Sequence, residues 1–132
     1  MKRLFLAILI VLFCIGTSFA LDWHTTNQAT VQWDAVTTYV DGTTISEGTV
    51  SYELFLINAT ETDKTKAVSI GTTVDTFKII TLDQKGEYYV GVKAMLTTDE
   101  KVSESTVSWS DAFGWGIRFY PALAAPGNFQ PQ

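Results

Sequence analysis

Residues 81–94 carry the pattern that most constrains how this chain can fold. Asp83, Lys85 and Gly86 form a polar turn, and apolar and polar side chains then alternate from Tyr88 to Ala94. A period of two places every second side chain on one face of a half-buried strand. A polar turn that leads directly into such a strand is typical of a corner between two β-sheets. The segment therefore predicts an all-β protein.

The rest of the chain repeats this alternation in short segments. Residues 29–35, 50–56, 76–79 and 106–109 each have one apolar face, rich in residues that suit a pleated surface. The expected inward-facing side chains are Ala29, Val31, Trp33, Val50, Tyr52, Leu54, Leu56, Phe77 and Ile79. Turn signals such as Asp41-Gly42 and Glu47-Gly48 separate the segments. This spacing predicts an all-β sandwich or barrel.

Residues 28–111 resemble a fibronectin type III domain. The residues that match the family pattern, in order, are Trp33, Tyr52, Phe77, Ile79, Leu82 and Tyr88. The resemblance implies an immunoglobulin-like β-sandwich of two antiparallel sheets, with Trp33 as the central plug of the core. It also implies that the Tyr88 hydroxyl, six residues beyond Leu82, bonds to backbone across the corner.

The chain departs from the family pattern at two places. The turn at residues 84–86 lacks the usual proline, and only about eight residues lie between Ala20 and the second strand. The first strand must therefore be short: residues 21–24 could form it, or it is missing.

The first twenty residues predict a signal peptide. Lys2 and Arg3 precede an apolar run, and Ser18-Phe19-Ala20 provides a cleavage site. We expect cleavage and export to an extracellular, periplasmic or cell-surface location. Retention as a membrane anchor is the alternative. Cys14, the only cysteine, follows Phe13 inside the apolar run, which argues against lipidation.

The predicted domain organisation has three parts. Residues 1–20 are the signal peptide, residues 21–112 the fibronectin type III-like domain, and residues 113–132 an aromatic and then Pro/Gly-rich tail. All three prolines lie in this tail, which disfavours a central strand there. The alternation of Trp115, Ile117 and Phe119 nevertheless suits an additional edge strand that covers the sheet.

The charge and the reactive side chains argue against several functions. Loss of Lys2 and Arg3 from nine basic residues leaves seven, against fourteen acidic ones, a net charge of −7. Such a surface repels nucleic acid and anionic lipid. His24 is the only histidine, and no Asp-x-Asp-x-Asp-Gly calcium loop occurs. We therefore expect no enzyme activity, cofactor or metal. A small hydrolase that uses two carboxylates is the weakest alternative.

Strand alternation also predicts an interaction surface. Phe55, Ile57, Tyr89 and Met95 would face outward as an exposed apolar patch, which either binds a partner or is covered by the tail residues Trp115, Phe119 and Tyr120. We favour the covering role. Asn58-Ala59-Thr60 matches an N-glycosylation acceptor pattern.

These features together predict a secreted, non-catalytic binding or spacer module with a protein or surface-glycan partner. No nucleic acid partner is expected, and no membrane partner after signal cleavage. The alternative is a structural subunit of an exported or surface assembly that docks through its aromatic tail.

Overall fold

A computed structural model describes residues 21–99 and 101–132. The predicted signal peptide lies outside these residues. Within them the chain is all-β, with two short 3-10 helices. Its elements are β1 (Asp22–Thr25), β2 (Gln28–Gln32), β3 (Thr49–Asn58), η1 (Lys64–Lys66), β4 (Val68–Thr73), β5 (Phe77–Thr81), β6 (Gly86–Thr97), β7 (Val102–Glu104), β8 (Ser108–Trp109), η2 (Ser110–Phe113) and β9 (Trp115–Phe119). None of the described helices is long and apolar enough to cross a membrane.

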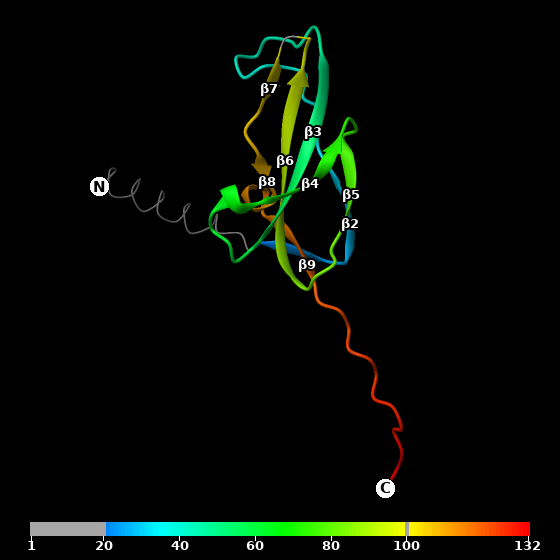
Figure 1. Cartoon of the computed structure of the whole chain (residues 1–132). Coiled ribbons are helices and arrows are strands. Elements are labelled where there is room, and N and C mark those ends of the chain that lie inside the picture. The colour runs from blue at the N-terminus through cyan, green and yellow to red at the C-terminus, as the bar shows by residue number, and fades with distance from the viewer. Residues whose placement is uncertain (1–20, 100) are drawn as a thin grey trace, which may run out of the picture.

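The strands form two sheets of unequal size (Figure 1). The larger sheet has the order β1-β9-β6-β3-β4, with β7 and β8 also paired to β6. The smaller sheet contains β2 and β5, which run antiparallel. The expectation that both sheets are antiparallel is wrong for the larger one. It is mixed, because β1 runs parallel to β9.

Both sheets contribute side chains to one core. Val31 and Ile80 of the smaller sheet join Leu54, Val90 and Ile117 of the larger one in a buried cluster. The long β3–β6 ladder aligns Leu54 with Val92 and Leu56 with Val90, so these apolar pairs share one face. Trp33 packs edge-on against Tyr52, with ring centroids 5.3 Å apart. The inward positions expected for β2, β3 and β6 are therefore confirmed.

The expected orientation of β5 is wrong. Phe77 and Ile79 are 52% and 56% exposed, whereas Ile80 is 3% exposed. The register with β2 explains the difference, because Ile80 lies opposite Ala29 and Lys78 opposite Val31. Paired residues share a face, so the inward face of β2 forces the even-numbered residues of β5 inward.

The corner between β5 and β6 has the expected chemistry. Leu82 is 4% exposed and its backbone N–H donates to the carbonyl of Asn27 at 2.7 Å. The Tyr88 hydroxyl donates to the carbonyl of Gln84 at 3.1 Å. This bond crosses the turn that precedes β6, as expected for a tyrosine at this position.

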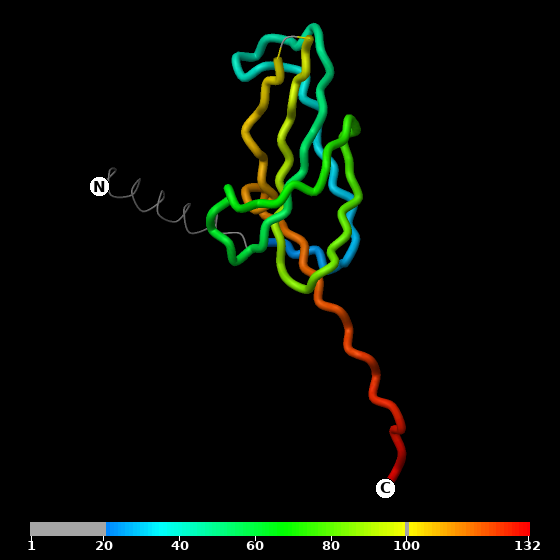
Figure 2. The backbone as a smooth tube through the Cα atoms, viewed as in Figure 1, coloured from blue at the N-terminus to red at the C-terminus, as the bar shows by residue number. Residues whose placement is uncertain are grey.

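The segment after residue 112 divides differently from the predicted tail. β9 lies between β1 and β6, and its Ile117 is 1% exposed. The expected additional strand therefore forms, but in the interior of the sheet and not at its edge. Residues 121–132, which we call the terminal tail, are all exposed and extend away from the body (Figure 2).

The Tyr88→Phe substitution is expected to lower the free energy of unfolding by about 0.5–1.5 kcal/mol, because it removes one intramolecular hydrogen bond without changing packing. Urea denaturation measures the change. Tyr89→Phe is the matched control, because the Tyr89 hydroxyl bonds to none of the described residues. Equal effects of the two substitutions would contradict a role for the corner bond.

Candidate binding site

β2 has a strand partner on one side only within the described residues. β5 pairs with one edge of β2, and β1, the strand before it, pairs with β9 in the other sheet. The short first strand anticipated from the sequence therefore exists, but it leaves the second edge of β2 open. Unpaired strand edges offer backbone groups to another chain.

The hydrogen bonds at the two ends of β2 identify the backbone groups at this open edge. Trp33 N–H donates to the Thr76 carbonyl at 3.0 Å, and Leu82 N–H donates to the Asn27 carbonyl at 2.7 Å. Antiparallel partners exchange bonds at alternate residues, so odd-numbered residues of β2 bond to β5. Even-numbered residues, which are Gln28, Thr30 and Gln32, then direct N–H and C=O groups outward.

One of these three residues is already satisfied. The Thr26 hydroxyl donates to the Gln28 carbonyl at 2.7 Å and accepts from the Gln28 N–H at 3.1 Å. Thr30 and Gln32 have no such bond within the part of the chain that the structure describes. Four backbone groups, two donors and two acceptors, are therefore free at the edge of β2.

A groove runs beside these free groups. Its larger part has a volume of about 790 Å³ and its smaller part about 690 Å³. The two parts share the lining residues Thr30, Val31, Gln32, Phe113 and Trp115, so they form one hollow between β2 and the β8–η2–β9 segment. We call this hollow the edge groove.

The far wall of the edge groove is held by two serine hydroxyls. Ser110 is 3% exposed and its Oγ accepts from the Val90 N–H at 3.0 Å. Ser105 Oγ accepts from the Ala94 N–H at 2.9 Å. Among the residues lining the larger part, Asp34 alone is charged, and most of the others are apolar. The larger part therefore favours an uncharged ligand with apolar side chains.

The outer face of the larger sheet, where the sequence predicts an interaction patch, is covered. Phe55 and Tyr89 are half-buried, and Ile57, expected to be exposed, is 4% exposed. The cover is a series of aromatic pairs separated by cations that we call the aromatic–cation row: Arg118, Trp23, Tyr89, Lys64, Trp109, Phe55 and Lys93. Successive members lie 5.0–6.5 Å apart, measured between ring centroids or from the cationic group to a ring centroid.

Two glycines allow the tryptophans to lie this close to the sheet. A Cβ atom at Gly91 would lie 2.8 Å from the Trp109 ring, and one at Gly116 would lie 2.6 Å from the Trp23 ring. Lys64, between Tyr89 and Trp109, also forms an ion pair with Asp111 at 2.9 Å. Cation–π contacts of this kind stabilise most where water is partly excluded.

The remaining predicted surface residues do not gather into one patch. Met95 is half-buried, and Trp115 and Phe119 pack against the core. Tyr120 is 54% exposed and its hydroxyl donates to Glu87 at 3.2 Å. Partial loss of solvent, together with the Glu87 charge, raises the pKa of Tyr120. The cover over Phe55 and Tyr89 thus comes from Trp23, Lys64 and Trp109 instead of the tail.

Groups suited to catalysis or metal binding are sparse. His24 is exposed and lies 3.7 Å from Asp22, and its ring contacts Trp115 edge-on. The described residues include no cluster of three or more metal-ligating side chains.

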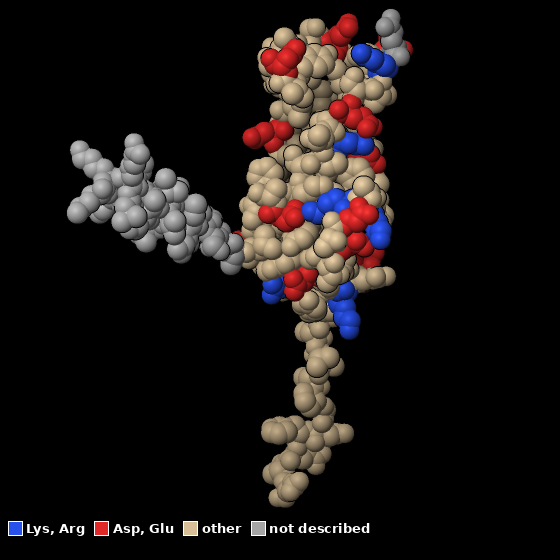
Figure 3. All heavy atoms as spheres, turned by 90° about the vertical axis from the view of Figure 1, so that its left-hand side faces the viewer, with Lys and Arg blue, Asp and Glu red and all other residues tan. Residues whose placement is uncertain are grey.

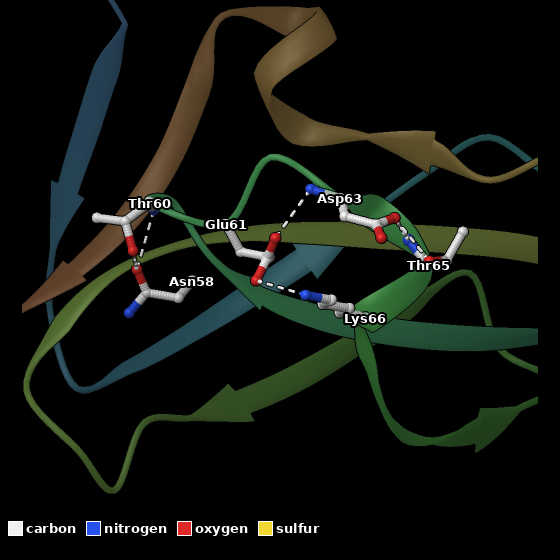
Figure 4. Close-up of polar contacts among 6 residues, drawn as sticks. All are labelled: Asn58, Thr60, Glu61, Asp63, Thr65 and Lys66. Carbon is white, nitrogen blue, oxygen red and sulfur yellow. Dashed lines mark hydrogen bonds and ion pairs between the residues drawn. The ribbon is translucent and has the colours of Figure 1, made fainter.

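The loop between β3 and β4 is ordered by short-range polar contacts (Figure 4). Asn58 Oδ1 accepts from the N–H and the hydroxyl of Thr60, and Asp63 Oδ1 accepts in the same way from Thr65. Asp41 and Thr43 repeat the arrangement in another loop. The threonine hydroxyl and then the backbone N–H hold the pKa values of Asp41 and Asp63 below the usual 3.8.

Comparison with protein-family models, curated proteins and solved structures found no significant match to this chain.

Replacement of Lys64 by Met is expected to lower the free energy of unfolding by about 1–2 kcal/mol, because it removes two cation–π contacts and the ion pair to Asp111. Chemical denaturation measures this change. Asp111→Asn should add little in the Lys64→Met background. Lys66→Met is the control, because Lys66 is well exposed and its ion pair with Glu61 is long, at 3.8 Å. Full additivity of the Lys64 and Asp111 substitutions would exclude the coupling.

Thr65→Val is expected to raise the pKa of Asp63 toward 3.8, because it removes the hydroxyl donor. A carboxyl group with a lowered folded-state pKa stabilises the fold above its unfolded-state pKa, and this contribution is lost as the pH falls through the folded-state value. Carbon-detected NMR titration of the Asp63 carboxyl group measures the pKa. Thr62→Val, in the same loop, should leave the pKa of Asp63 unchanged; a similar rise in both variants would refute the assignment.

Proposed function

We propose that the described residues form a fibronectin type III-like β-sandwich and that the protein is an exported, non-catalytic binding module. The module takes an extended peptide segment of a protein partner into the edge groove. The strand pairings β2–β5 and β3–β6, the Trp33–Tyr52 contact and the corner hydrogen bond of Tyr88 support the sandwich assignment.

The observation that carries the proposed function is the open edge of β2 beside an apolar groove. An extended peptide that pairs with Thr30 and Gln32 would satisfy four backbone groups, and its alternate side chains would enter the groove. Strand addition of this kind draws affinity from backbone hydrogen bonds and specificity from side-chain pockets.

The chemistry of the groove supports binding and offers little for catalysis. Hydroxyl groups of Ser105, Ser108 and Ser110 lie along one wall, and the two carboxylates of the edge groove line different parts of it, Asp34 the larger and Asp22 the smaller. A hydrolase of the glycosidase type requires two carboxylates on either side of the reacting bond. The aromatic–cation row is a less suitable docking surface, because its members already contact one another.

The Thr30→Pro substitution tests this function with little expected effect on the fold. The Thr30 N–H faces away from β5, and proline is tolerated on an edge strand when the lost N–H faces solvent. Peptides that bind the exported wild-type protein are first selected from a random-peptide display library. The Thr30→Pro variant is expected to keep its stability and to lose binding of these peptides. Amide exchange supplies a second readout: Thr30 and Gln32 should exchange quickly in the free protein and slowly in the complex.

Val31→Pro is the matched control. Its N–H is directed toward β5, so the substitution leaves a buried acceptor unbonded and is expected to lower the free energy of unfolding by about 1–3 kcal/mol. Selected peptides that bind wild type and Thr30→Pro equally well would refute the proposed function.

A further inference from the structure

We propose that the edge groove of one copy accepts residues 122–125 of a second copy, so that copies associate head to tail by strand addition. This inference rests on the function proposed above, because it names the peptide that the groove takes. The argument depends on the exposure, charge, register and reach of the terminal tail.

The terminal tail carries apolar side chains that are almost fully in water. Leu123 is 95% exposed and Phe129 is 97% exposed. The tail leaves the end of β9 and extends away from the body in two views at right angles (Figures 1 and 3). Two large apolar side chains held in water within one twelve-residue segment favour contact with another surface.

Charge makes the tail the part of a second copy best suited to enter the groove. The whole chain has a net charge of −5 at pH 7, so two bodies repel each other. Residues 121–132 contain no Asp, Glu, Lys or Arg, as the tan tail in Figure 3 shows. An uncharged segment therefore meets a groove whose larger part has only Asp34 as a charged lining residue.

An antiparallel register aligns the tail with the open edge of β2. Placing Leu123 opposite Val31 puts Ala122 opposite Gln32 and Ala124 opposite Thr30. Ala122 and Ala124 then exchange backbone hydrogen bonds with the two residues whose outward groups are free. Leu123 shares the inward face of Val31, so its side chain enters the groove.

The prolines mark where this pairing ends. Pro126 falls opposite Gln28, whose outward N–H and C=O are already bonded to the Thr26 hydroxyl. Pro121 falls opposite Trp33, whose N–H bonds to Thr76 in β5. The missing N–H groups of both prolines therefore lie where the open edge of β2 has no free carbonyl to accept a hydrogen bond.

Phe129 is less suited to the same role. Asn128 before it has a φ angle of 52°, a left-handed conformation that interrupts an extended strand. Phe129 is therefore a matched apolar residue outside the proposed register.

The reach of the chain favours a second copy over the same chain. The Arg118 carbonyl accepts from the Thr26 N–H at 3.0 Å, so β9 ends near the Gln28 end of β2. The antiparallel register needs Pro121 beside Trp33, about 16 Å further along the strand at roughly 3.3 Å per residue. Three residues from Arg118 to Pro121 span at most about 11 Å. Because a groove and a tail are different surfaces, the contact is heterologous and produces open chains.

Sedimentation velocity over a concentration series tests the inference with the exported protein. Wild type is expected to associate as its concentration rises. Leu123→Asp should weaken association at least about tenfold, because it removes one buried leucine from the contact. Phe129→Asp, which introduces the same charge outside the register, should weaken it far less. Equal losses in both variants would overturn the register.

A mixing experiment separates the two halves of the contact. Thr30→Pro blocks the groove and keeps the tail, whereas Leu123→Asp disables the tail and keeps the groove. Each variant alone should remain monomeric, and an equimolar mixture should form a one-to-one complex that grows no further. Absence of that complex would overturn the head-to-tail contact. Slow exchange of the Thr30 and Gln32 amides in a monomeric wild type would instead show that the chain's own tail occupies the groove.

A synthetic peptide of residues 120–132 separates this inference from the proposed function. Binding of this peptide to wild type and not to Thr30→Pro supports both. Library peptides that bind wild type but not Thr30→Pro would support the proposed function. If the peptide of residues 120–132 then fails to bind wild type, the second copy is excluded and the proposed function stands. If no peptide binding is sensitive to Thr30→Pro, both fail.

Discussion

The parallel pairing of β1 with β9 determines where this fold is closed and where it stays open. β1 is four residues long and is followed almost directly by β2, so it can serve only one of the two sheets. By joining β9 it extends the larger sheet and brings Trp23 next to Tyr89. The same choice leaves the smaller sheet with two strands and β2 with an unpaired edge. The edge groove is therefore a direct result of how a short first strand is used.

Packing on the two faces of the larger sheet explains why we place the proposed contact at this edge and not on a flat surface. One face is buried against Val31 and Ile80 of the smaller sheet. The other is covered by the aromatic–cation row, in which Lys64 and Lys93 also pair with carboxylates. Side chains that already contact one another have less to gain from a partner than backbone groups without one. The outward N–H and C=O groups of Thr30 and Gln32 have no partner among the described residues.

Much of the fold was predictable because local pattern and tertiary environment agree. Tyr52 and Leu54 recur at a spacing of two in β3, as Tyr88, Val90 and Val92 do in β6, and Tyr52, Leu54 and Val90 are buried. The pattern failed at β5, because Phe77, Ile79 and Ile80 place apolar side chains at both odd- and even-numbered positions. Pairing with β2 decides which of these two sets faces the core. β4 was missed because Gly71 and two threonines give residues 68–73 no clear alternation.

The amino-acid sequence by itself determined the β-rich character of the chain, the corner at Tyr88 and the charge-free, proline-punctuated composition of the tail. These properties depend on the order of neighbouring residues, which is all that a period of two or a turn signal requires. Tertiary structure alone decided that Ile57 is buried, that β9 lies inside a sheet and that the edge of β2 is open. Each of these depends on which strand pairs with which over a separation of many residues, and hydrogen bonding between strands carries no local signature in the chain.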